Sequence, residues 1–402
     1  MLIAGLAEGP DAAAALVELV DGKAELRALV YQQSVDRQPH SAAFPSAALD
    51  AVLDVAGRKP RDLDRIVVTG LRAVPMPKGA SPGIQRVAAS RRLASVFRTT
   101  GAYRASHDRA AARVEQWASD AGFRASISTV ETDLAHAHLA YRTSGAGRVV
   151  VIVAGTWPDG AGISVFEARN GQIDPLPALG RGAGRASIAE VLRAQKPGER
   201  VILAGDAFAH GFGRDRLGPT SSVAPLLGNG GAALGAALWE AGPSPANLDC
   251  GLLGPGFTSD SAYKALSNAQ QPRDRATRED VVTAATNALR RGERVAWAVG
   301  RAGSEADLLP GRALLHRDDG VAGWRLLLGD PQRAGDIVAV EPTLRALLTV
   351  TGPLRASPLA RPGEPAALTP TDVIRVFRSA RGDTPTEPPP ALLVLDDYLV
   401  AG

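Results

Sequence analysis

The chain has 402 residues, of which 45% are apolar, so it can bury the cores of two or three domains and is not disordered throughout. A net charge of +3 is too small for a general nucleic-acid binder. Cys250 is the only cysteine, which excludes an internal disulfide and a cysteine-based zinc site. The sequence has neither a signal peptide pattern nor the ~20 consecutive apolar residues of a membrane helix. We therefore expect a soluble, cytoplasmic protein that binds neither nucleic acid nor membrane.

The N-terminal segment has the pattern of an antiparallel meander. Strands are predicted at 2–6, 12–20 and 24–31, with a polar turn at 8–11. Asp21-Gly22 separates the second and third strands. This dipeptide is typical of a two-residue hairpin because both positions require a positive φ.

The same order of signals recurs from residue 149. Strands at 149–153 and 163–168 flank a turn at 156–160, and Asn170-Gly171 marks a second hairpin. Helices are predicted between the two copies, at 46–55, 84–96, 107–120 and 134–141. A duplicated meander followed by helices is typical of the actin, hexokinase and sugar-kinase fold, in which two lobes clasp a nucleotide. The alternative is two unrelated hairpins.

A third domain is predicted after the duplicated part. A strand at 200–203 and a helix of small residues at 228–238 complete the second copy, and a polar linker follows at 267–276. Thr277 is placed to cap a helix that ends near 290, and a strand follows at 295–299. The expected fold class is α/β, with lobes at 1–148 and 149–270 of an actin/hexokinase-like domain and a C-terminal α/β domain at 277–402.

Short motifs recur along the chain in a definite order. They are Phe44-Pro45, Leu134-Ala135-His136-Ala137, Leu203-Ala204-Gly205, 228–238, Gly300-Arg301 with Arg312, Gly363-Glu364-Pro365, Thr369-Pro370 with Asp372, and 395–400. In this order they resemble the O-carbamoyltransferase family of antibiotic and nodulation-factor biosynthesis, of which this chain looks like a degenerate, shortened member.

The resemblance implies a two-part enzyme. The family's nucleotide-clasping domain holds ATP and a metal, and its second domain is YrdC-like, as in threonylcarbamoyl-adenylate synthases. That second domain makes carbamoyl-adenylate from carbamoyl phosphate and ATP, and the first transfers the carbamoyl group to an acceptor hydroxyl. By resemblance, the C-terminal domain here is a truncated YrdC-like domain.

Most positions of the family's metal site are changed. Its two histidines lie four apart on one helix, and two aspartates complete the ligand set. Here His136 remains, but the partner position is Thr132 and the aspartate positions are Ala154 and Asn229. We therefore expect no bound metal.

The nucleotide-binding positions are altered as well. Asp206 replaces a glycine after the 200–203 strand, and His210 replaces an asparagine. In the C-terminal domain Asp307 stands where the family has a phosphate-binding arginine. Arg301 and Arg312 persist as candidate phosphate ligands, although they could equally be ordinary surface arginines.

These losses favour a pseudoenzyme of natural-product biosynthesis that has lost ordinary carbamoyl transfer. It would bind a pathway substrate, a precursor peptide or an active homologous subunit, and could form a homo-oligomer; we expect no required cofactor. The alternative is a repurposed or residually active acyl or carbamoyl transferase that uses ATP and carbamoyl phosphate, with His136, His210 and Asp206 as candidate catalytic residues. A belt of arginines could dock an acidic partner or form a solvated helix face; it comprises Arg86, Arg91, Arg92, Arg98, Arg104, Arg109 and Arg113.

Overall fold

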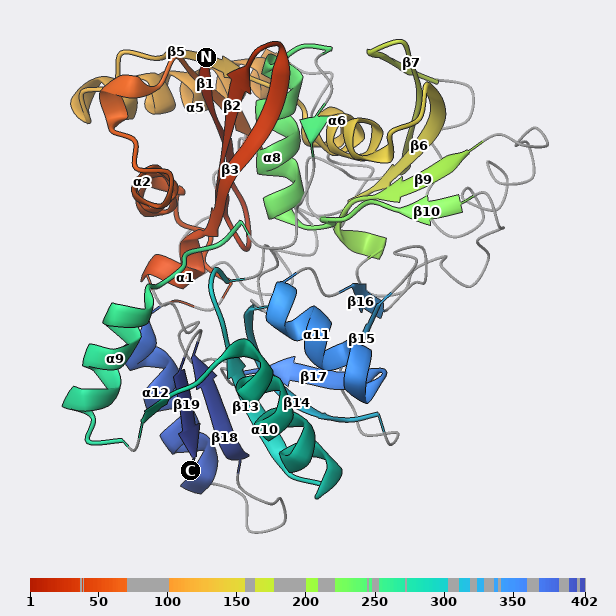
Figure 1. Cartoon of the computed structure of the whole chain (residues 1–402). Coiled ribbons are helices and arrows are strands. Elements are labelled where there is room, and N and C mark those ends of the chain that lie inside the picture. The colour runs from red at the N-terminus through yellow and green to blue at the C-terminus, as the bar shows by residue number, and fades with distance from the viewer. Residues whose placement is uncertain are drawn as a thin grey trace, which may run out of the picture. The chain divides into compact units, whose positions relative to one another are not determined.

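The computed structural model shows an α/β protein (Figure 1). It describes residues 1–36, 38, 40–70, 101–155, 163–176, 200–208, 221–243, 246–247, 253–271, 273–302, 311–318, 324–328, 336–338, 341–359, 369–382, 390–395 and 398–401. The predicted helix at 84–96, the turn at 156–160, Cys250 and Asp307 lie outside these residues.

The chain forms two compact units. The first comprises Met1–Gln32 and His40–Leu248, and the second Gln33–Pro39 and Asp249–Gly402. Both predicted lobes fall largely in the first unit. The second unit begins earlier than the predicted residue 277, because α9 (Ser259–Asn268) contributes Ala262 and Leu266 to the core of that unit.

The first sheet of the N-terminal unit contains the predicted meander. Its strands are β1 (Leu2–Ala7), β2 (Ala13–Val20), β3 (Lys23–Tyr31), β4 (Arg65–Thr69), β5 (Ser126–Thr129) and β11 (Ala246–Asn247). The order is β11-β3-β2-β1-β4-β5, with β1 antiparallel to β2 and parallel to β4. The predicted hairpin is confirmed, because Asp21 and Gly22 have φ of 49° and 74°.

The second sheet repeats this arrangement. It consists of β6 (Arg148–Ala154), β7 (Ile163–Arg169), β8 (Gln172–Pro175), β9 (Val201–Ala204) and β10 (Ser221–Val223). The order is β8-β7-β6-β9-β10, again with two antiparallel neighbours followed by two parallel ones. The shared order β3-β2-β1-β4-β5 confirms the internal duplication and the actin/hexokinase-like class of the N-terminal unit.

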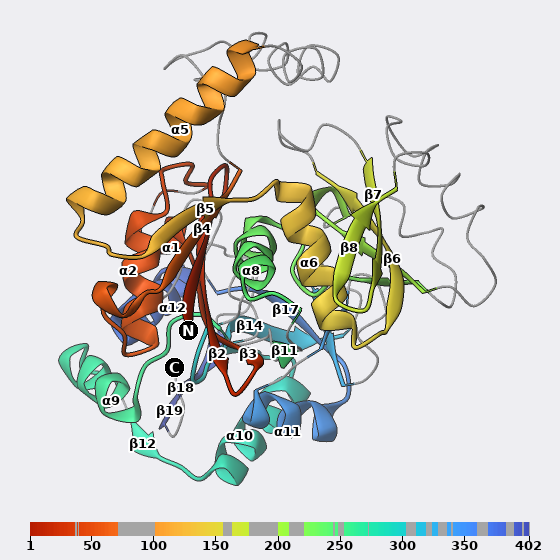
Figure 2. The ribbon, with the colours of Figure 1, turned by 90° about the horizontal axis from the view of Figure 1, so that it is seen from above.

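Two helices lie between these sheets. Helix α8 (Asn229–Glu240) packs on β1, β2 and β4, although it follows the second sheet in the chain. Helix α6 (Thr132–Ser144) precedes the second sheet, packs on β6 and β9, and contacts α8 (Figure 2). The inner side of the first sheet is thus covered by α8, which follows the strands of the second lobe. The inner side of the second sheet is covered by α6, which precedes them. On the far side of the first sheet, α2 (Ser46–Val55) contacts β2 and β3.

The prediction for the segment between the two copies was incomplete. The helix expected at 107–120 is α5 (Gly101–Asp120), and that expected at 134–141 is the longer α6. The short strands β4 and β5 were not predicted. Both are parallel strands of four or five residues, which carry too little periodicity to stand out.

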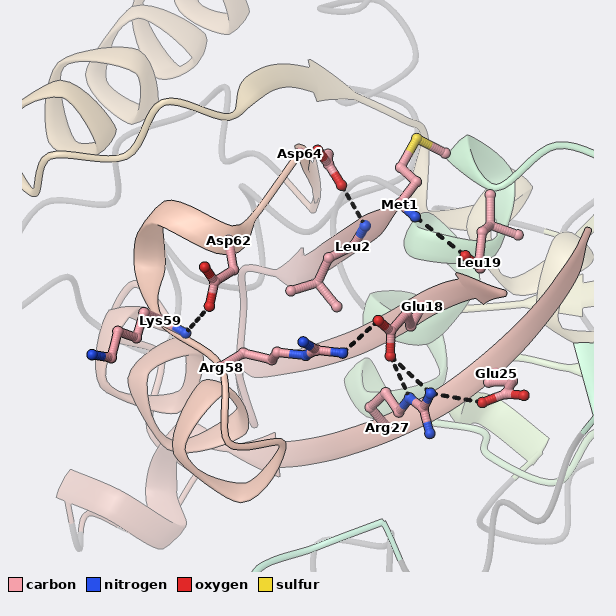
Figure 3. A network of polar contacts seen from close by, with 10 residues as sticks. All are labelled: Met1, Leu2, Glu18, Leu19, Glu25, Arg27, Arg58, Lys59, Asp62 and Asp64. Carbon is pink, nitrogen blue, oxygen red and sulfur yellow. Dashed lines mark hydrogen bonds and ion pairs between the residues drawn. The ribbon is translucent and has the colours of Figure 1, made fainter. Parts of the chain in front are cut away.

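Polar contacts fix the outer end of the first meander (Figure 3). The Glu18 carboxylate on β2 accepts hydrogen bonds from Arg27 Nε at 2.8 Å and Arg58 Nη2 at 2.6 Å. The backbone N–H of Leu2 donates to Asp64 Oδ2 at 2.6 Å. These contacts connect β1, β2 and β3 to the segment between α2 and β4.

The second unit is built on one mixed sheet, of order β12-β19-β18-β13-β14-β17-β15-β16. Its strands are β12 (Asp274–Arg275), β13 (Arg294–Ala298), β14 (Arg312–Arg317), β15 (Trp324–Leu327), β16 (Asp336–Val338), β17 (Leu354–Pro358), β18 (Pro390–Leu395) and β19 (Tyr398–Ala401). Side chains alternate, so Val295 and Trp297 face a core with α10 (Arg278–Arg290) and α11 (Pro342–Thr351). Ala296 and Ala298 face another core with α9 and α12 (Pro370–Gly382). The predicted cap is confirmed, because Thr277 Oγ1 accepts from the Asp280 N–H at 3.2 Å.

No helix in the described part of the chain is long and apolar enough to cross a membrane.

We expect Gly235→Ala to destabilise the N-terminal unit strongly. A Cβ at Gly235 would lie 1.9 Å from the carbonyl oxygen of Ala135 on α6, so one helix must move. Overpacking of this kind costs about 1–3 kcal/mol or more. The midpoint of urea denaturation, followed by circular dichroism, measures the loss.

Gly147→Ala is the matched control for this substitution. A Cβ at Gly147 has no heavy atom within 4 Å, so its effect should stay within about 0.5 kcal/mol. Equal midpoints for the two variants would contradict close backbone packing between α6 and α8.

Candidate functional site

The duplicated topology creates two positions suited to ligand binding. In open α/β sheets, ligands bind outside the carboxyl ends of parallel strands where the connections run to opposite sides. The first lobe has this switch point between β1 and β4, and the second between β6 and β9. We call the residues at these strand ends, with the first turns of α6 and α8, the switch-point region.

In the first lobe, a buried carboxylate lies at the end of β1. Glu8 is 7% exposed, and its Oε1 accepts a hydrogen bond from Arg113 Nη2 of α5 at 2.8 Å. Its backbone N–H donates to the Thr69 carbonyl at 3.0 Å, so the ends of β1 and β4 are held together. Arg113 belongs to the belt of arginines that could dock an acidic partner. Its ion pair with Glu8 already engages it within the chain.

An aspartate–histidine pair joins this loop to the connection that precedes α2. His40 Nδ1 is 3.0 Å from Asp11 Oδ1 and 3.3 Å from Oδ2. Both residues have a positive φ, 58° at Asp11 and 52° at His40. This pair could not be predicted from the sequence, because 29 positions separate the two residues and no spacing rule connects them.

Two buried histidines lie on α6. His136 is 4% exposed and His138 is 8% exposed, and neither Nδ1 atom has a hydrogen-bond partner. Burial lowers the pKa of His136 to about 4, while the nearby Asp206 carboxylate acts in the opposite direction. Burial, and to a lesser degree the charge of Arg142, lowers the pKa of His138 to about 3. Both side chains are therefore neutral at pH 7.

The structure brings together two of the predicted catalytic candidates. Asp206 begins the 3-10 helix Asp206–Phe208 directly after β9, close enough to His136 for their charges to interact. The third candidate, His210, lies outside the described residues.

The residues at the other positions of the family's metal site contact neighbouring groups of the protein. Thr132 Oγ1 accepts from Thr69 Oγ1 at 3.2 Å, and Asn229 Nδ2 donates to the Pro10 carbonyl at 2.5 Å. Ala154 is 3% exposed, and its backbone packs closely against Gly205. A Cβ at Gly205 would lie 2.4 Å from the carbonyl oxygen of Ala154. Within the described residues, no three His, Cys, Asp or Glu side chains come together as a metal site.

In the second unit, the candidate phosphate ligands contact the backbone. Arg312 is 1% exposed, donates to the carbonyls of Val299, Gly300 and Gly311 at 3.1, 3.0 and 2.6 Å, and stacks on Phe257 at 4.2 Å. Arg301 donates to the carbonyls of Gly254 and Leu253 at 3.0 and 2.6 Å. Burial lowers the pKa of Arg301. Their use as phosphate ligands stays a prediction.

Carboxylates dominate the described side chains of the switch-point region. Glu8, Asp11 and Asp206 follow strand ends, and Asp133, which accepts from Ser164 Oγ at 2.5 Å, lies in the first turn of α6. Such a region suits neutral or cationic groups better than phosphates, because like charges repel in a partly buried setting.

No protein-family profile matches the chain, and no curated protein sequence matches it. Among solved structures, it is similar to YeaZ from Pseudomonas aeruginosa, with 18% identity, a TM-score of 0.30, and coverage of 60% of this chain and 92% of that chain. The ROK hexokinase from Thermus thermophilus has 16% identity and a TM-score of 0.31, with 59% and 98% covered. The ethanolamine utilization protein EutJ from Carboxydothermus hydrogenoformans has 14% identity and a TM-score of 0.33, with 59% and 89% covered.

The buried histidines predict that the protein loses stability in acid. Because the folded-state pKa values of about 4 and 3 lie below the usual 6.5, the unfolded chain binds protons first as the pH falls. The free energy of unfolding should therefore fall from pH 6.5 towards pH 4, by up to about 1.4 kcal/mol per pH unit for each histidine. Urea denaturation at a series of pH values measures this slope.

The double variant His136→Gln/His138→Gln provides the comparison. Removing both titrating groups should flatten the dependence between pH 6.5 and 4, whatever the effect on absolute stability. An unchanged slope would mean that other groups cause the acid sensitivity.

Proposed function

We propose that this chain is a degenerate, shortened carbamoyltransferase-like protein that has lost ordinary carbamoyl transfer. Its C-terminal unit would be a truncated YrdC-like domain. The protein would act in natural-product biosynthesis by binding a pathway substrate, a precursor peptide or an active homologous subunit.

The observation that carries this proposal is the burial of His136 and the lowered pKa of its side chain. It is the one retained ligand of the resembling metal site, and it is buried on α6 with a pKa of about 4. Neither Thr132 nor Asn229 offers a replacement, since both side chains bond to neighbouring protein groups. A divalent ion held by a single imidazole would dissociate readily.

The charge of the switch-point region supports the same proposal. A nucleotide bound between the lobes would bring its phosphates towards the strand ends, where Glu8, Asp11 and Asp206 carry carboxylates. Arg113, the cation beside Glu8, is already ion-paired. ATP would therefore meet repulsion there.

We expect no pyrophosphate release when the full chain is incubated with ATP, carbamoyl phosphate and either magnesium or iron(II). An active carbamoyltransferase of the family, assayed in parallel, provides the positive control, and a reaction without protein gives the background. Release above that background would show that adenylation survives and would overturn the proposal.

A second candidate function is a repurposed acyl or carbamoyl transferase, favoured by the charge interaction between His136 and Asp206. For any group transfer detected with a pathway substrate, His136→Ala, Asp206→Ala and His210→Ala should each abolish the activity. Full activity in both His136→Ala and His210→Ala would exclude this candidate. Circular dichroism of each variant would separate a loss of chemistry from a loss of folding.

A further inference from the structure

We propose that His40 is a general base, held in position by Asp11, that removes a proton from a bound hydroxyl group or water at the end of β1. This inference is independent of the proposed function, since the chemistry requires neither ATP nor a metal.

The hydrogen-bond geometry supports this role. The Asp11 carboxylate engages Nδ1 of His40 through both oxygens, at 3.0 and 3.3 Å. A carboxylate on Nδ1 fixes the imidazole tautomer that has its basic lone pair on Nε2, the arrangement by which histidine bases are oriented in acyl-transfer enzymes. The His40 side chain is 81% exposed, so a substrate can reach it, and the Asp11 side chain is 32% exposed.

The backbone at both residues is unusual. Asp21 and Asn170 also have a positive φ, but each is followed by a glycine in a two-residue hairpin, and Gln270 has one directly after the C-cap of α9. Asp11 and His40 are in longer connections that face each other, with φ of 58° and 52°. Non-glycine residues held in this region cluster at functional sites, because the surrounding structure must compensate for the strain.

The surrounding contacts hold the pair in place. The Ala12 N–H donates to the Ser41 carbonyl at 3.1 Å, which joins the two connections next to the pair. On the other side, Asn229 at the start of α8 donates to the Pro10 carbonyl at 2.5 Å. Asp11 is thus fixed through both of its chain neighbours, as the orientation of a catalytic base requires.

The charges nearby define the class of substrate. Asp11 and Glu8 lie on the same loop, and Arg113 is engaged by Glu8. A neutral or cationic hydroxyl compound fits this setting, and an anionic one does not. In the step we propose, the substrate O–H bond breaks, its proton passes to His40 Nε2, and the oxygen bonds to the carbonyl carbon of an activated acyl compound. The bond from that carbon to the leaving group then breaks, and the imidazolium gives its proton to the departing group.

Hydrolysis of p-nitrophenyl acetate by the full chain tests the proposal, with water as the nucleophile and acetate and nitrophenol as products. The variants are His40→Asn and Asp11→Asn, since asparagine tolerates a positive φ and should preserve the backbone. His316→Gln, in the other unit, is the matched control. Free imidazole at the same concentration gives the reference rate.

We expect the wild-type protein and His316→Gln to exceed free imidazole, and His40→Asn to lose the excess by a factor of about 100 or more. Asp11→Asn should lower the rate about tenfold, because asparagine no longer holds the imidazole in the reactive tautomer and orientation. Asp11→Glu should restore part of the rate, because it returns the carboxylate.

Three results would overturn the inference. One is a wild-type rate no higher than that of free imidazole, and another is a His40→Asn rate within twofold of wild type. The third is an Asp11→Glu rate as low as that of Asp11→Asn, which would leave Asp11 a merely structural role. None of these results bears on pyrophosphate release, so this inference and the proposed function can fail separately.

Discussion

The N-terminal unit depends on direct backbone packing around α8. On one side, a Cβ at Gly5 of β1 would lie 1.9 Å from the carbonyl oxygen of Ala233. On the other, a Cβ at Gly235 would lie 1.9 Å from the carbonyl oxygen of Ala135 on α6. Side chains are absent from both contacts, so the helix lies closer to its neighbours than ordinary packing allows. This closeness explains why 228–238 consists of small residues, and why α6 and α8 together form the inner layer between the two sheets (Figure 2).

The same packing determines the environment of the candidate residues. Because α6 is pressed between α8 and the second sheet, His136 and His138 are removed from water and held neutral. Because α8 begins beside the loop after β1, Asn229 can reach the Pro10 carbonyl. His40 lies outside this inner layer, in the connection before α2, and there its imidazole is open to solvent.

Local chemistry decided which parts of the structure the sequence could predict. The two hairpins were predicted correctly because Asp21-Gly22 and Asn170-Gly171 require a positive φ, whatever surrounds them. Strands β4 and β5 escaped prediction because both are short and β5 is largely polar, so their role follows only from pairing: β4 is the parallel neighbour of β1, and β5 that of β4. The proximity of His136 to Asp206 and of His40 to Asp11 depends on contacts between distant segments, which no spacing in a single sequence encodes.

The distribution of histidines separates two kinds of chemistry. A metal-dependent or nucleotide-dependent reaction needs several ligands that converge on one point, and the loss of any one of them weakens the binding by the others. A general base needs one imidazole, one carboxylate and access to water. The described residues hold the exposed His40 imidazole against the Asp11 carboxylate, whereas Ala154 and Asn229 stand at two positions of the resembling metal site. We therefore propose that the chain lacks the family's reaction and keeps, beside the end of β1, the elements of a simpler one.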